Sequence, residues 1–202
     1  MTTRIKCIKY RYKMKGLFMR VISGIAKGTK LNSIDDLSTR PTLDRVKEAL
    51  FNIIQNHLQE AEILDLFAGS GALGIECLSR GSTHCTFCDK SYKSIKMLEQ
   101  NIERTRFESK STIINTSYEK CLEKVKGSKF DVIFIDPPYK LDIAVKSIKM
   151  ILDYNILAKD GIIVLETDEE ERELEELKNI NLEVYDVRKY GRVKLIFLRE
   201  RG

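Results

Sequence analysis

An acidic residue, two prolines and a tyrosine follow one another in this sequence, as Asp136, Pro137, Pro138 and Tyr139. They end the nearly all-apolar stretch 130–136, which predicts a buried strand. A carboxylate and a carbonyl held still by proline rings can each accept one hydrogen of an amine, which aims its lone pair. A neighbouring aromatic ring can stack on an extruded nucleobase. The run therefore indicates chemistry at the exocyclic amine of a base. The alternative is a Pro-rich loop that simply leaves the sheet.

A second motif is a Gly-rich turn in the stretch 63–74, which reads as a buried strand, a turn and the start of a helix. Gly69 and Gly71 lack a Cβ, so the backbone can turn sharply and approach a ligand closely. Gly74 lets the helix sit close to the sheet. Backbone N–H groups at a helix N-terminus favour a carboxylate or a phosphate. This predicts a nucleotide-type cofactor loop, and the alternative is an ordinary strand–turn–helix unit without a ligand.

The turn differs from two common nucleotide loops. No Gly-Lys-Ser/Thr closes it, so it is not a P-loop, and Asp65 precedes the glycines inside the strand, unlike in the dinucleotide fingerprint. Asp89 ends the next predicted strand, where a ribose hydroxyl pair would be held. Together with the run at Asp136, these features resemble the motifs of the S-adenosylmethionine-dependent amino-methyltransferases.

The resemblance implies S-adenosyl-L-methionine as the cofactor and two sets of site residues. The cofactor-binding set is Asp65, Phe67, Ala68, Gly69, Ser70, Gly71, Gly74, Asp89, Lys90, Ser117 and Tyr118. The catalytic set is Asp136, Pro137, Pro138 and Tyr139. Many related enzymes have an Asp where Ser117 stands, so this position departs from the pattern.

Repeated strand–helix units predict the fold class. Strands are expected at about 62–67, 84–89, 112–116, 130–136, 161–166, 181–189 and 193–199, and helices at 43–57, 72–80, 91–104, 118–125 and 142–153. Thr42 is expected to cap the first helix, and the acid-rich segment 168–176 is expected to be a solvated helix. This alternation predicts a Rossmann-like α/β class I methyltransferase with a mostly parallel seven-stranded sheet, whose C-terminal hairpin adds one antiparallel strand.

The charge is unevenly distributed along the 202 residues. Nine Lys or Arg residues occur up to Lys30, before the first acid, Asp35, whereas the rest of the chain has 26 basic and 30 acidic residues. A basic arm on a mildly acidic body suggests a polyanionic partner such as nucleic acid, and the alternative is a solvated tail. We expect a basic, disordered extension at 1–18, a hairpin and helix at 19–58, and the methyltransferase domain at 59–202.

A more specific resemblance covers Met19 to the C-terminus. The motifs that carry this resemblance occur in order at 20–24, 27–28, 40–42, 44–51, 65–74, 79–81 and 136–139. With these motifs the chain resembles the RsmD-type family, which methylates N2 of one guanine in small-subunit (16S) rRNA. The resemblance implies an assembled or partly assembled small ribosomal subunit as the substrate. It also implies RNA or cofactor contacts for Arg20, Lys27, Arg40, Thr42 and Arg45; a plain surface role for Arg45 is the alternative.

Two rival functions stay open. A DNA adenine-N6 methyltransferase shares the motif order, but such enzymes usually carry a separate target-recognition domain, and the predicted elements use up this chain. A non-catalytic RNA-binding protein on the same scaffold would not need the run from Asp136 to Tyr139. A dehydrogenase is disfavoured because no substrate domain or acid–base histidine is evident.

The composition indicates the cellular compartment in which we expect the protein. No apolar run reaches the roughly 18 residues that span a membrane, and no secretory signal is evident, so we expect a cytoplasmic monomer with reduced thiols. Cys85 and Cys88 would point to opposite faces of one strand, which disfavours a shared metal ion. We therefore expect no metal, no membrane contact, and surface or helix-end positions for His57 and His84.

Overall fold

The computed structural model describes residues 19–33, 40–137, 143–168, 170–191 and 193–201. The side chains of residues 40–43 are likewise not described. The predictions for the extension 1–18 and for Pro138 and Tyr139 lie outside the described residues. Within the described part of the chain, no helix is long and apolar enough to cross a bilayer.

One seven-stranded sheet organises the molecule, in the strand order β5-β4-β3-β6-β7-β9-β8. The strands are β3 (Glu62–Asp65), β4 (His84–Asp89), β5 (Ser111–Asn115), β6 (Phe130–Ile135), β7 (Leu157–Thr167), β8 (Leu182–Tyr190) and β9 (Val193–Glu200). The pairs from β5 to β7 are parallel, and β9 runs antiparallel to both of its neighbours. The predicted fold class, with one antiparallel strand from the terminal hairpin, is confirmed.

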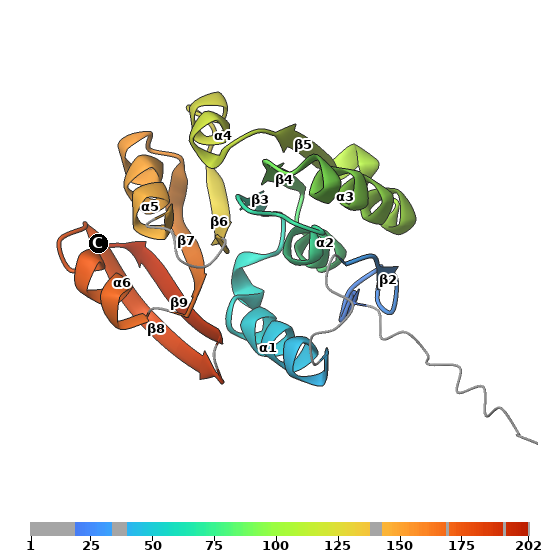
Figure 1. Ribbon diagram of the computed structural model, residues 1–202, viewed down its shortest axis with the longest axis horizontal. Helices are drawn as coiled ribbons and strands as arrows, with labels where there is room; N and C mark the ends of the chain where they lie inside the picture. Colours follow the sequence, from blue (N-terminus) through green and yellow to red (C-terminus); the bar gives the residue numbers. More distant parts are fainter. Residues whose placement is uncertain (1–18, 34–39, 138–142, 169, 192, 202) are drawn as a thin grey trace, which may run out of the picture.

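Helices cover both faces of the sheet (Figure 1). They are α1 (Arg40–Ile53), α2 (Ala72–Ser79), α3 (Tyr92–Thr105), α4 (Tyr118–Lys124), α5 (Ile143–Asp153) and α6 (Glu170–Leu177). One core cluster joins α1, α2 and α3 to the sheet, and a second joins α4, α5 and α6 to the other face. Successive side chains of a strand point into different clusters, since Ile63 belongs to the first and its neighbour Leu64 to the second. Both faces of the parallel strands are therefore buried.

A short hairpin precedes the first helix, as the sequence predicts. Its strands are β1 (Met19–Arg20) and β2 (Lys30–Leu31), which pair antiparallel and lie beside α2 and α3 (Figure 1). The following helix begins at Arg40, three residues before the predicted start, so Thr42 lies inside the first turn and the capping prediction is wrong. Pro41 is tolerated there because the first N–H groups of a helix have no partner within the helix. After Ile53 the chain tightens into a 3-10 turn, Gln55–His57.

The acidic helix α6 is not fully solvated, which corrects the prediction for this segment. Glu170 and Glu173 are buried, with 6% and 5% of their surface exposed. The Oε2 atom of Glu170 lies 2.9 Å from Nζ of Lys189 and 3.8 Å from Nζ of Lys194. These lysines of the terminal hairpin compensate the buried charge, so α6 docks on β8 and β9 by charge as well as by apolar contact.

Candidate active site

A cavity of about 440 Å³ opens at the carboxyl ends of β3, β4, β5 and β6. Its lining residues are Leu66, Phe67, Asp89, Lys90, Thr116, Ser117, Tyr118, Glu119, Asp136, Pro137 and Ile143. Parallel strands present their carboxyl ends at one edge of the sheet, so residues far apart in sequence meet there. The cavity thus brings together the acid after β4, the residues after β5 and the acid after β6, which the sequence placed at strand ends.

The Gly-rich turn between β3 and α2 adopts the backbone that its glycines permit. Gly69 and Gly71 have φ angles of 54° and 78°, in the left-handed region that favours glycine. The backbone N–H of Gly69 donates to Oδ2 of Asp89 over 2.9 Å, and Oδ1 of the same carboxylate accepts from the N–H of Ser91 over 2.7 Å. Asp89 therefore holds the turn against the end of β4 while its side chain lines the cavity.

Gly74 permits close contact between α2 and the sheet. A Cβ at this position would lie 2.3 Å from a ring carbon of Phe87 and 2.5 Å from Sγ of Cys85. The N–H of Gly74 donates to Oδ2 of Asp65 over 3.1 Å, below the turn. Burial raises the pKa of Asp65 to about 7, against the lowering effect of the Gly74 hydrogen bond and with a further rise from the charges of Asp136 and Asp89. Asp65 is thus a buried support of the turn and does not line the cavity.

The other predicted residues of the turn differ in their relation to the cavity, which Phe67 lines and Ala68 and Ser70 do not. Phe67 lines the cavity, and its ring centroid is 5.7 Å from that of Tyr118, with the two planes tilted by 40°. Ala68 is buried, and its N–H donates to the carbonyl of Cys88. The carbonyl of Ser70 accepts from Nδ2 of Asn101 over 2.8 Å. Phe67 and Tyr118 provide an apolar wall, whereas Ala68 and Ser70 shape the backbone.

Asp136 provides a carboxylate at the carboxyl end of β6. It lines the cavity beside Pro137, whose ring is buried. Burial raises the pKa of Asp136 to about 6, so its carboxyl is ionised at neutral pH and remains a better base than an exposed aspartate. A carboxylate at this place can accept a hydrogen bond from an amine that enters the cavity. The cavity therefore combines a basic carboxylate with an apolar wall, and the glycine turn is joined to it through Asp89.

The polar residues after β5 sit where the sequence placed them. Ser117 precedes the first turn of α4, and its side chain makes no capping hydrogen bond there. Burial raises the pKa of the Tyr118 hydroxyl, with a smaller contribution from the charge of Glu119. Lys90 is exposed at the rim of the cavity.

The residues predicted to contact RNA lie on the hairpin and on α1. Nε of Arg20 lies 3.3 Å from Oδ2 of Asp44 on the surface, and Lys27 and Arg45 are exposed. The backbone of Arg40 and Thr42 forms the start of α1. None of the five lines the 440 Å³ cavity, as far as the described residues define it. Their RNA contacts stay a prediction.

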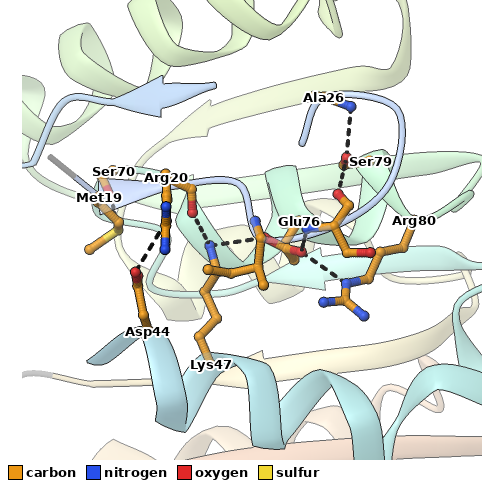
Figure 2. Close-up of polar contacts among 12 residues, drawn as sticks. Met19, Arg20, Ala26, Asp44, Lys47, Ser70, Glu76, Ser79 and Arg80 are labelled. Carbon is orange, nitrogen blue, oxygen red and sulfur yellow. Dashed lines mark hydrogen bonds and ion pairs between the residues drawn. The ribbon is translucent and has the colours of Figure 1, made fainter. Parts of the chain in front are cut away.

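A buried ionic cluster, which sequence reasoning missed, attaches the hairpin to α2 (Figure 2). Glu76 is fully buried and accepts from the N–H groups of Ile22 and Ser23 over 2.8 and 2.9 Å. Its carboxylate lies 3.0 Å from Nζ of Lys47 and 2.9 Å from Nε of Arg80. The available signal was one acid within an otherwise apolar helix, 72–79. A charged side chain on a buried helix face needs hydrogen-bond or ionic partners, so an acid such as Glu76 indicates that another segment of the chain packs against this helix.

Two further contacts fix the hairpin. Oγ of Ser79 donates to the carbonyl of Ser23 and accepts from the N–H of Ala26 over 3.0 Å (Figure 2). After β2, Asn32 is held by Asn101 of α3. Nδ2 of Asn101 donates to the carbonyl of Asn32 over 3.0 Å and also to the glycine turn. Oδ1 of Asn101 accepts from the N–H of Asn32 over 2.7 Å. The hairpin is therefore tied to both ends of the unit formed by the glycine turn and α2.

The thiols and histidines stand apart from this site. Cys85 belongs to the first core cluster and Cys88 to the second, so the two side chains face opposite sides of β4 as predicted. In the part of the chain that the structure describes, no three potential metal ligands gather. His57 ends the 3-10 turn, and Nε2 of His84 lies 2.9 Å from Oγ1 of Thr112.

Comparison with known proteins places these features in context. A family model described as "Conserved hypothetical protein 95" matches residues 19–199. YlbH of Bacillus subtilis is 42% identical over 154 residues, which is 75% of this chain and 84% of YlbH. Ribosomal RNA small subunit methyltransferase D of Haemophilus influenzae is 35% identical over 154 residues, covering 75% of this chain and 80% of the relative. The solved structure of yhhF from Escherichia coli has a TM-score of 0.76 at 26% identity and covers 91% of this chain and 98% of yhhF.

Proposed function

The chain belongs to the family described as Conserved hypothetical protein 95, that of the RsmD-type methyltransferases, and on this premise we propose that it methylates the exocyclic N2 of a guanine in small-subunit (16S) rRNA. The single observation that carries the proposal is that Asp136 lines the same cavity as Asp89. Relatives that are named as small-subunit rRNA methyltransferases support RNA as the substrate class.

The cavity fits S-adenosylmethionine as the methyl donor. Its volume of about 440 Å³ lies in the range of small-molecule sites. Asp89 would accept from the ribose hydroxyls, and the wall of Phe67 and Tyr118 would flank the adenine, beside Ser117. The backbone at Gly69 and its neighbours would hold the methionine part. When bound, the cofactor supplies a methyl group on a positively charged sulfur.

Asp136 directs the amine in the mechanism that we propose. Its carboxylate accepts one amine hydrogen, and the carbonyl of Pro137 accepts the other, so the nitrogen lone pair points away from these two acceptors and toward the methyl donor in the cavity. Placing the two reactants in this way can lower the barrier by about 7–11 kcal/mol. Asp136 then takes the proton that the amine nitrogen releases, which its raised pKa favours. The sequence adds Pro138 and Tyr139 to the proposed site, with Tyr139 predicted to stack on the base.

The form of the substrate is part of the proposal. Residues 19–33 and 40–137 contain the hairpin, α1 and the first half of the sheet, and the rest of the described chain completes that sheet. The described residues thus include no separate target-recognition domain, which supports a particle that supplies part of the recognition. We therefore propose a small-subunit assembly particle in the cytoplasm as the substrate. Action as a monomer stays a prediction.

Transfer of labelled methyl groups tests the proposal. Wild-type protein, Asp136→Ala and the control Asp153→Ala, whose acid is exposed at the end of α5, are each incubated with naked 16S rRNA and with 30S particles. We expect wild type and control to label one guanine, located by nuclease mapping, and Asp136→Ala to lose transfer while binding S-adenosylhomocysteine normally by calorimetry. Retained turnover in Asp136→Ala would refute the assigned role, and label on the proteins of the 30S particles but not on rRNA would refute the substrate.

A further inference from the structure

An exposed tyrosine stands beside the candidate active site. Tyr92 begins α3, three positions after Asp89, which lines the cavity. Tyr92 is 65% exposed, and the other exposed large apolar residues in the described part of the chain are Ile25 at 82% and Val184 at 36%. The buried face of α3 is supplied by other residues, including Ile95 and Leu98. Packing of α3 therefore does not account for an aromatic ring at this position.

Three exposed lysines lie close to Tyr92 in the sequence. Lys90, Lys93 and Lys96 are exposed, and Nζ of Lys96 lies 4.7 Å from the centroid of the Tyr92 ring. Within the described residues, no acidic side chain forms an ion pair with any of these lysines. Lys90 also lines the cavity, so this charged surface is continuous with the candidate active site. The charges of Lys93 and Lys96 are thus available to a partner, whereas the charge of Lys90 also interacts with that of Glu119.

We propose that the surface formed by Lys90, Tyr92, Lys93 and Lys96 binds an unpaired stretch of RNA next to the target nucleotide. The Tyr92 ring stacks on a base, and the lysines contact the flanking phosphates. The inference rests on the proposed function, because the site would hold the substrate strand whose base enters the cavity. It adds a contact surface on α3, separate from the hairpin and α1 positions.

The chemistry of the surface favours RNA over a protein partner. It offers one flat ring and three cations, whereas a stable protein interface needs a larger apolar centre. Single-stranded nucleic acid is bound by this combination, because every base has a face that can stack and every nucleotide carries a phosphate. Sequence-specific proteins also recognise RNA mainly in unpaired loops and ends, where bases are free to stack. Nζ of Lys96 already lies over the Tyr92 ring in a cation–π contact, and a base that stacks on the same ring can join this contact.

Binding of naked 16S rRNA, measured over a series of salt concentrations, tests the surface. Tyr92→Ala should raise the dissociation constant by roughly 5- to 150-fold, the range for loss of one stacked base. Tyr92→Phe keeps the ring and should stay within about twofold of wild type. Lys93→Gln and Lys96→Gln should each reduce the slope of affinity against salt by about 0.7, the value for one phosphate contact on a single strand.

A matched control lies on the other face of the sheet, beside the helices of the second core cluster. Lys126 is also exposed, with Nζ 5.2 Å from the ring centroid of Tyr154, but neither residue lines the 440 Å³ cavity. Lys126→Gln should leave both the RNA affinity and its salt slope unchanged. Calorimetry with S-adenosylhomocysteine should give the wild-type affinity for every variant, which confirms that the fold and the cofactor site are intact.

The outcomes separate this inference from the proposed function. If Tyr92→Ala binds rRNA like wild type, or if Tyr92→Phe fails to restore binding, the inference is overturned even when wild type methylates rRNA. An equal loss of salt slope in Lys126→Gln would also overturn it, because the effect would then be one of net charge. If wild type binds rRNA through Tyr92 but transfers no methyl group, the proposed function fails and the RNA-binding surface stands.

Discussion

The carboxylate of Asp89 accepts a hydrogen bond from the backbone N–H of Gly69, across 2.9 Å and between segments 20 residues apart in the chain. One side chain therefore both shapes the glycine turn and lines the cavity. We therefore expect the acid that ends β4 to affect cofactor binding through the turn as well as by direct contact.

Replacing Asp89 tests this relationship. Asp89→Ala removes the acceptor for Gly69 and for Ser91, and a hydrogen bond to a charged group is worth about 1.5–3 kcal/mol. We expect the affinity for S-adenosylhomocysteine to fall by roughly 10- to 150-fold, measured by calorimetry. Asp89→Asn should fall between, because its amide can accept from only one of the two N–H groups. An unchanged affinity in Asp89→Ala would show that the turn does not depend on this carboxylate.

Methyl transfer should depend on the ionisation of Asp136. Burial raises the pKa of this carboxyl to about 6, and only the ionised form can both accept from the amine and take up its proton. The acceptor is thus present above pH 6 and lost below it. Single-turnover rates should be constant above neutral pH and fall by about tenfold for each unit below 6. A rate that stays flat from pH 8 to pH 5 would contradict the role.

A second buried acid provides the control for that profile. Asp65 has a pKa raised to about 7, and its carboxyl contacts Gly74 beneath the turn. Asp65→Asn removes this titration while retaining an oxygen that can accept from the N–H of Gly74. If the fall near pH 6 persists in Asp65→Asn, it belongs to Asp136. Calorimetry at the same pH values separates a loss of cofactor binding from a loss of transfer.

Gly69 and Gly74 should respond differently to the same substitution. A Cβ at Gly69 meets no atom within 4 Å, although its φ of 54° costs an alanine about 1–2 kcal/mol. A Cβ at Gly74 would overlap the ring of Phe87. We expect Gly69→Ala to fold but bind S-adenosylhomocysteine more weakly. Gly74→Ala should lose about 1–3 kcal/mol of unfolding free energy in urea. Weaker binding of S-adenosylhomocysteine by Gly74→Ala than by Gly69→Ala would contradict this distinction.

The buried Glu76 cluster should matter for stability. Glu76→Gln leaves Lys47 and Arg80 with a neutral partner in a buried place, where breaking an ion pair costs about 3–5 kcal/mol. Urea unfolding should show a loss of this order, whereas Glu99→Gln on the exposed face of α3 should change stability little. Since Glu76 holds the hairpin through Ile22 and Ser23, proteolysis within 19–31 should also speed up. Stability equal to wild type would mean that the cluster contributes only specificity.

Much of this fold could be predicted from local patterns. The alternation of apolar strands and amphipathic helices depends on periods within short segments, and the strand His84–Asp89 was predicted with its observed bounds. The glycine turn could also be predicted, because positive φ angles at Gly69 and Gly71 follow from what only glycine tolerates. The acids after β4 and β6 were placed at one edge because parallel strands leave no other arrangement.

Other features depend on contacts that no short segment contains. Glu76 accepts from Ile22 across 54 positions of sequence, and Asn101 reaches the carbonyl of Ser70 across 31. The insertion of β9 between β7 and β8, the burial of Glu170 and the exposure of Tyr92 depend equally on which elements pack together. Local sequence sets the conformations that a segment can adopt, but the partners of a buried charge are chosen only when distant segments meet. The sequence alone therefore determined the strands, helices and glycine turn, and the tertiary structure decided how the hairpin, the cavity and the α3 surface are joined.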